Sequence, residues 1–155
     1  MRLSGRLLYR TALEVESSIV ITSVERGARL TFSDLVPESD PNFYTFVATV
    51  EQPGLRASVK VYDMDGEPDS GRLADFFSAL AEEWRGWEGE KEWAALEGQL
   101  ALSCTSDRTG HARLVARLGE ATHWDGWSAE TVLTLDVMQR ERIAKEVLRF
   151  FDRAV

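Results

Sequence analysis

Hydrophobic and polar residues alternate along much of the chain, with the period of two that is typical of strands with one buried face. The alternation is clearest at 55–61 and at 111–118. Other segments with strand-like composition or alternation lie at 18–23, 28–33, 43–50, 96–104 and 131–135. Turn-forming residues separate consecutive segments. The pattern predicts an antiparallel β-sheet of about six to seven strands.

Two further segments have the period of 3.6 residues that is typical of amphipathic helices. The apolar stripe of the first is formed by Leu73, Phe76, Phe77, Leu80 and Trp84. The stripe of the second is formed by Ile143, Val147 and Phe150. Asp136 and Gln139 precede the second stripe with the spacing of a capping box. The expected fold is α+β, with the two α-helices packed on one face of the sheet.

Chain length and cysteine content restrict the organisation of the protein. The 155 residues are the length of one domain, so a single domain over 1–155 is expected, and residues 1–17 are left open as a peripheral segment. Cys104 is the single cysteine, which excludes an internal disulfide and fits a reducing compartment. We find neither a secretory signal nor an apolar run long enough to span a membrane. A cytoplasmic protein is therefore expected.

The charge is acidic and concentrated in one segment. The formal net charge is −8, and residues 63–97 hold eleven acidic and three basic side chains. Phosphate binding needs a basic surface, so we predict neither a nucleic-acid partner nor a membrane partner. The acidic segment is either a solvated surface or a surface that attracts a basic protein.

Known catalytic, metal-binding and phosphate-binding motifs are absent from the sequence. Cys104 is expected on an inward strand face, where cysteine is usually an inert apolar residue. We predict no metal site and no cofactor. One acid–base candidate is His111 with Asp107 or Glu97. Its alternative is a turn in which Asp107 accepts backbone N–H groups.

Tryptophans make the most unusual local feature of the sequence. Trp84, Trp87 and Trp93 lie within ten residues of one another, among charged side chains. They form either a packed corner between helix and sheet or an aromatic and acidic binding surface. In the second interpretation the binding residues are Glu82, Glu83, Trp84, Arg85, Trp87, Glu88 and Glu90.

The same region carries a family resemblance. The segment from Trp84-Arg-Gly-Trp to Leu96-Glu-Gly, followed by Asp107-x-x-Gly-His111, resembles a family of small uncharacterised bacterial proteins that is similar to WapI-type immunity proteins. The resemblance extends from Ile19 to the C-terminus. It implies a non-enzymatic protein that binds and neutralises a cognate toxin, often a nuclease.

Three functional hypotheses follow. The first is a non-enzymatic binding protein, an immunity protein that meets a basic toxin through the region from Glu82 to Glu92. The second is a small enzyme that uses His111 with a carboxylate, and it requires both side chains in a concave pocket. The third is a homo-oligomeric scaffold or regulatory protein, which requires an exposed apolar patch.

Overall fold

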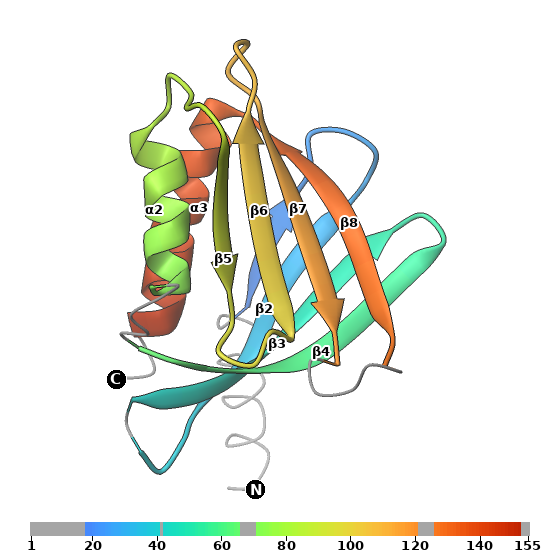
Figure 1. Ribbon diagram of the computed structural model, residues 1–155, viewed down its shortest axis with the longest axis vertical. Coiled ribbons are helices and arrows are strands. Elements are labelled where there is room, and N and C mark those ends of the chain that lie inside the picture. The colour runs from blue at the N-terminus through green and yellow to red at the C-terminus, as the bar shows by residue number, and fades with distance from the viewer. Residues whose placement is uncertain (1–17, 41, 66–70, 121–125, 153–155) are drawn as a thin grey trace, which may run out of the picture.

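The computed structural model describes residues 18–40, 42–65, 71–120 and 126–152. The expected peripheral segment 1–17 lies outside the described residues. These residues form two antiparallel sheets and two helices, and the helices lie side by side (Figure 1). Within the described part of the chain, no helix is both long and apolar enough to cross a membrane.

Each sheet is a four-stranded meander whose neighbours in sequence are neighbours in space. The first sheet consists of β1 (Ile19–Thr22), β2 (Arg29–Pro37), β3 (Phe43–Gln52) and β4 (Leu55–Met64). The second consists of β5 (Glu90–Ala94), β6 (Leu100–Ser106), β7 (Ala112–Gly119) and β8 (Ser128–Leu135). Helix α2 (Leu73–Glu82) follows the first sheet, and α3 (Val137–Asp152) follows the second.

The chain thus repeats one order, four strands and then a helix. The helices pack against each other, and each also contacts the first strand of the opposite sheet: α2 contacts β5, and α3 contacts β1. Strands β3 and β4 of the first sheet contact β7 and β8 of the second. The two halves of the chain are therefore interlocked through their helices as well as through their sheets.

The core lies between the inward faces of the two sheets and the helices. Phe32 and Phe46 of the first sheet pack edge to face at 5.6 Å, and Phe32 contacts Phe77 of α2 at 6.3 Å. Leu102 and Leu114 on the inward face of the second sheet are almost completely buried. Burial of each such side chain contributes roughly 1.5–3 kcal/mol to folding.

The expected α+β class with antiparallel strands is confirmed, but the expected single sheet of six to seven strands is wrong. Eight strands form two sheets: α2 lies between β4 and β5 in the chain, and these two strands do not pair. An alternating pattern records that one face of a strand is buried. It does not record whether a helix or a second sheet covers that face.

The strand expected at 96–104 is displaced towards the C-terminus. Residues between Ala95 and Leu100 form a turn, in which the Leu100 carbonyl accepts the Ala95 N–H at 2.9 Å. Gly98 occupies the turn with φ of 75°. Leu96, expected on the inward face, is 40% exposed as a result. The sequence analysis also missed β5, whose Glu-Lys-Glu-Trp-Ala sequence places one apolar aromatic residue among charged ones.

The predicted capping box at the start of α3 is confirmed. The Gln139 N–H donates to Asp136 Oδ1 at 2.7 Å, and the Asp136 N–H donates to Gln139 Oε1 at 3.3 Å. The Gln139 side-chain amide also donates to the Thr22 carbonyl at the end of β1. The cap therefore joins the last helix to the first sheet.

Candidate functional site

The predicted binding residues lie at the end of α2 and in the connection to β5. Helix α2 ends at Glu82, so Trp84 lies beyond the helix and not on its apolar stripe, as the sequence analysis had placed it. Trp84 is 53% exposed. All but one of the predicted residues are exposed, namely Glu82, Glu83, Trp84, Arg85, Glu88 and Glu90, and Trp87 is half-buried.

The three clustered tryptophans have different environments. Trp93 is buried and donates its indole N–H to the Gly71 carbonyl at 3.0 Å. Trp87 donates its indole N–H to the Cys104 carbonyl at 3.3 Å. Trp84 presents its ring at the surface, where the Arg85 guanidinium lies 4.8 Å from the ring centroid. Trp93 therefore belongs to the packed corner, Trp87 borders it, and Trp84 is free to meet a partner.

A buried arginine of α3, Arg140, holds the connection between α2 and β5 in place. Arg140 is 2% exposed, and its guanidinium donates to the carbonyls of Leu80, Trp84 and Gly110 at 3.3–3.4 Å. It also lies 5.7 Å from the centroid of the Trp87 ring. Desolvation lowers the pKa of Arg140. Arg140 thus fixes the end of α2, the exposed tryptophan and the β6–β7 hairpin relative to one another.

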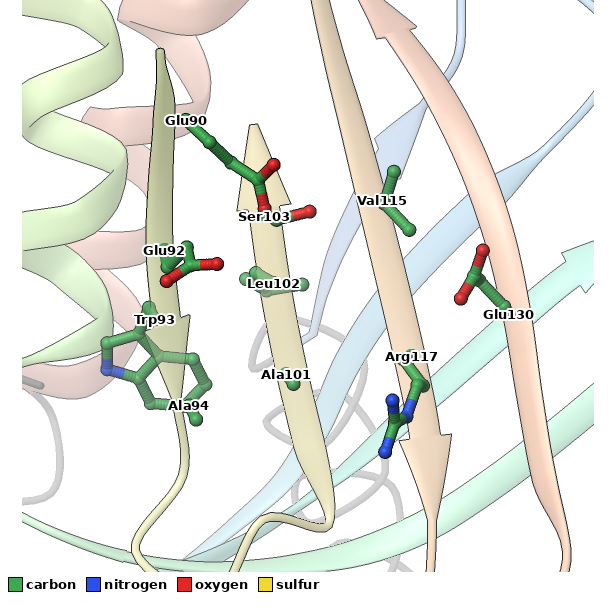
Figure 2. Close-up of a pocket in the computed structure, with 10 residues that line it drawn as sticks. All are labelled: Glu90, Glu92, Trp93, Ala94, Ala101, Leu102, Ser103, Val115, Arg117 and Glu130. Atoms are coloured by element: carbon green, nitrogen blue, oxygen red, sulfur yellow. The ribbon is translucent and has the colours of Figure 1, made fainter. Parts of the chain in front are cut away.

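The outward face of the second sheet is hollowed next to these residues, as Figure 2 shows. The hollow has a volume of about 500 Å³. Glu90 and Glu92 border it on β5, whereas Arg117 and Glu130 border it on β7 and β8. Small side chains of β6 form its floor, those of Ala101 and Ser103. Glu90 belongs to both the hollow and the connection from α2, so the two features are continuous.

We define the acidic surface as Glu82, Glu83, Trp84, Glu88, Glu90 and Glu92. Glu83 forms an ion pair with Lys91 at 2.8 Å. Among the described residues, Glu82, Glu88, Glu90 and Glu92 form no ion pair. Their charges are therefore exposed to solvent and are not neutralised by neighbouring side chains.

The sequence analysis included Glu92 in the region from Glu82 to Glu92, but it did not single out Arg117 and Glu130 as binding residues. Arg117 and Glu130 occupy paired positions on β7 and β8, and Glu92 pairs with Ser103 of β6. In the sequence, these residues are indicated by the outward-facing positions of the alternating strands. Those positions can be aligned across the whole sheet once β5 is placed at 90–94.

The fold separates Glu97 from His111, the histidine of the acid–base candidate. Glu97 lies in the turn before β6, whereas His111 lies beyond the opposite end of that strand. Because β6 has seven residues, the two positions are roughly 20 Å apart. Glu97 is therefore excluded as the partner of His111. Asp107 does lie near His111, with 3.9 Å between Asp107 Oδ2 and His111 Nδ1.

Asp107 has the contacts of a turn residue. Its Oδ1 accepts the Thr109 N–H at 2.8 Å, the Thr109 hydroxyl at 2.7 Å and the His111 N–H at 3.0 Å. These hydrogen bonds lower the pKa of Asp107 and make it a weaker base, and the bond from the Thr109 hydroxyl has the largest effect. Both Asp107 and His111 nevertheless line a cleft, which is the setting that the enzyme hypothesis requires.

Cys104 is buried on the inward face of β6. Burial raises its pKa to about 12, from an ordinary value of 9.0. Within the described parts of the chain, no group of three or more histidine, cysteine, aspartate or glutamate side chains is placed to hold a metal ion.

We expect Cys104 to react slowly with iodoacetamide in the folded protein. At pH 8 the raised pKa leaves about a thousand-fold less thiolate than an ordinary cysteine has. Because the pKa is higher in the folded state, this group stabilises the fold fully below about pH 9 and progressively less above it. Alkylation followed by mass spectrometry, in buffer and in urea, measures the difference. Equal rates in the two solvents would show that the thiol is accessible.

A family model matches residues 21–154, which is most of the chain. The protein belongs to the DUF6228 family. The description of DUF6228 is a family of unknown function, so membership assigns no activity to the acidic surface or to the cleft. No match was found among curated proteins or among solved structures.

Proposed function

We propose that this protein is a non-enzymatic binding protein whose acidic surface binds a basic protein, and that this partner is a toxin which it neutralises. The observation that carries the proposal is the set of exposed glutamates without ion pairs around exposed Trp84. Unpaired charges attract an oppositely charged partner, whereas an exposed tryptophan supplies apolar contact area.

The shape of the surface is consistent with this role. The hollow on the second sheet continues the surface from Glu90 towards Glu130, over a floor of small side chains (Figure 2). A basic side chain of the partner, seated in this hollow, meets Glu90 and Glu92 from one side and Glu130 from the other. Arg117 lies next to Glu130 and limits how much positive charge the hollow accepts.

Arg140 makes the surface suitable for tight binding. Because it fixes the carbonyl of Trp84 and contacts Trp87, the connection between α2 and β5 is ordered before a partner arrives. A surface that is already ordered loses less conformational entropy on association. Immunity to a toxin requires high affinity, so such preorganisation favours this role.

The enzyme hypothesis has weaker support. Asp107 is engaged in its own turn, and Glu97 lies at the other end of β6. For the homo-oligomer hypothesis, the described residues include exposed apolar side chains, among them Val20, Val36, Met138 and Leu148. A contiguous apolar patch would favour it more strongly.

The test compares two variants with equal change in net charge. In the first, glutamines replace Glu82, Glu88, Glu90 and Glu92. In the control, glutamines replace four glutamates from other surfaces, Glu38, Glu120, Glu141 and Glu146. Tagged wild-type protein first captures its partner from a lysate of the source cells at low salt. Binding of the purified partner to all three proteins is then measured at two salt concentrations.

We expect one stoichiometric basic partner that is released by salt. Loss of the four charges of the acidic surface should weaken its binding by at least about ten-fold, while the control variant binds nearly as wild type does. Expression of the partner alone should arrest growth, and co-expression of wild-type protein should restore it. Equal binding by both variants would show that the acidic surface is not the interface. Binding without protection would retain the binding role and refute the immunity role.

A further inference from the structure

A second concave site lies beside the acidic surface, between the β1–β2 turn and the second sheet, and Thr105 in its lining pairs with Glu90. The cleft has a volume of about 570 Å³, within the range of small-molecule sites. Its walls include Arg26 of the turn and His111 of the β6–β7 hairpin, and its floor includes Thr105, Arg113 and Thr134. The hypotheses based on sequence did not consider this combination of basic and hydroxyl side chains.

The turn that forms one wall is fixed to the other sheet. The Val24 N–H donates to the Thr134 carbonyl at 2.9 Å, and the Thr134 N–H donates to the Ser23 hydroxyl oxygen at 2.9 Å. The same hydroxyl oxygen accepts the Glu25 N–H at 3.2 Å. These bonds join the first sheet to β8 at the cleft, so its opening is held at a defined width.

The floor of the cleft brings polar donors together on paired strand positions. Arg113 of β7 pairs with Thr105 of β6 on one side and with Thr134 of β8 on the other. All three side chains lie on the outward face, opposite buried Cys104, Leu114 and Leu133. Within the described residues, the Thr105 and Thr134 hydroxyls make no hydrogen bond and Arg113 makes no ion pair. A guanidinium between two hydroxyls is a donor set suited to the oxygens of an anion.

Arg26 occupies an unusual backbone conformation at the edge of the cleft. Its φ is 64° and that of Gly27 is 66°, which are the values of a turn that normally contains asparagine or glycine. A residue other than glycine in this region carries backbone strain. Arg26 has no ion pair with a described residue that would compensate for it. Its side chain lines the cleft that Arg113 also lines.

The lining of the cleft also holds two carboxylates, Asp107 and Glu25, which balance the formal charges of Arg26 and Arg113. A bound anion is therefore favoured by the placement of the donors and not by net charge. Asp107 directs Oδ1 at three donors of its own hairpin. Because the Thr109 hydroxyl donates its proton to Asp107, it can only accept from His111 Nδ1, at 3.0 Å. Glu25 is the other carboxylate of the lining, on the exposed turn.

We infer that this cleft binds a small organic anion, with a phosphate or carboxylate group held between Arg26 and Arg113 and hydrogen-bonded by Thr105 and Thr134. The cleft shares no lining residue with the hollow of the proposed toxin interface, although Thr105 pairs with Glu90 at their border. An acidic protein of net charge −8 repels anions in general, so a site for one requires such a local concentration of donors.

The experiment is a titration of ¹⁵N-labelled protein with inorganic phosphate, and separately with acetate, at constant ionic strength set by chloride. Wild-type protein should show saturable chemical-shift changes that are confined to residues around Arg26, Thr105, Arg113 and Thr134. The anion that binds more tightly shows whether the ligand carries a phosphate or a carboxylate group. Arg26→Gln and Arg113→Gln should each weaken its binding by about ten-fold, because each removes a charge-assisted pair of hydrogen bonds.

Arg142→Gln is the matched control, since it removes an exposed positive charge from α3 and should leave binding unchanged. Arg113→Lys keeps the charge but loses the forked donor geometry, and it should bind with intermediate affinity. Shift changes that do not saturate, or that spread over lysines and arginines elsewhere, would overturn the inference. Unchanged affinity in the folded Arg26→Gln and Arg113→Gln proteins would overturn it as well.

Discussion

Replacement of Arg140 by alanine is expected to lower the free energy of unfolding by about 3 kcal/mol. The substitution removes donors from the carbonyls of Leu80, Trp84 and Gly110, and each lost hydrogen bond contributes about 1 kcal/mol. Removal of the guanidinium also relieves its desolvation, because Nε has no partner within the described residues. The loss should dominate, since an unpaired buried carbonyl has a penalty of its own and the side chain leaves a cavity.

Urea unfolding followed by tryptophan fluorescence measures this change. For a chain of this length the melting temperature should fall by roughly 10 °C. Arg142→Ala on the exposed side of the same helix is the control, with an expected change within about 0.5 kcal/mol. Arg140→Met keeps most of the apolar volume and should lie between the two. If Arg140→Ala were as stable as the control, the three carbonyl contacts would contribute nothing to stability.

Asp63→Ala is expected to have an effect of similar size at the other end of the molecule. Asp63 is 1% exposed, and its carboxylate accepts the Tyr44 hydroxyl at 3.2 Å and the Leu96 N–H at 3.1 Å. Burial, and then the nearby Asp63, raise the pKa of Tyr44, so its hydroxyl remains a donor at ordinary pH. Hydrogen bonds to a charged group contribute about 1.5–3 kcal/mol each, so a loss of about 3 kcal/mol is expected.

A double-mutant cycle with Tyr44→Phe separates the contributions. Tyr44→Phe alone should lower the free energy of unfolding by about 1 kcal/mol, and it should have little further effect once Asp63 is alanine. Asp65→Ala, two residues away and exposed, is the control. Additive effects of the two substitutions would contradict a direct bond between Tyr44 and Asp63. Full stability of Asp63→Ala would show that the buried carboxylate is not needed to hold the turn after β5.

Strands with strict alternation were predictable because their pattern is local. The segment at 55–61 falls within β4, and the segment at 111–118 begins one residue before β7 and otherwise falls within it. The capping box at Asp136 was also readable, since its two residues are separated by a fixed interval. The division into two sheets was not readable, because burial of one face leaves the same pattern whatever element covers it.

The candidate site was predictable in part. The exposed glutamates were identified from their density in the sequence. The hollow beside them could not be predicted without β5, and β5 was not recognised as a strand because most of its residues are charged. Arg140 was missed because arginine on a helix is usually exposed. Its position contained a signal: it precedes Ile143 by three residues and Val147 by seven, so it lies on the apolar stripe of α3. A basic residue on such a stripe indicates a buried partner.

The exchange of helices between the two halves has a consequence for synthesis of the chain on the ribosome. Strand β1 is among the first described elements to emerge, but its neighbour α3 is the last. Helix α2 contacts the first sheet through Phe77 and Phe32, but its contacts with β5 form only after that strand has been made. The apolar face of the first meander is therefore covered only in part until the second sheet and α3 have been made. Contacts between such distant segments make folding slow and leave an interval in which chaperones can act.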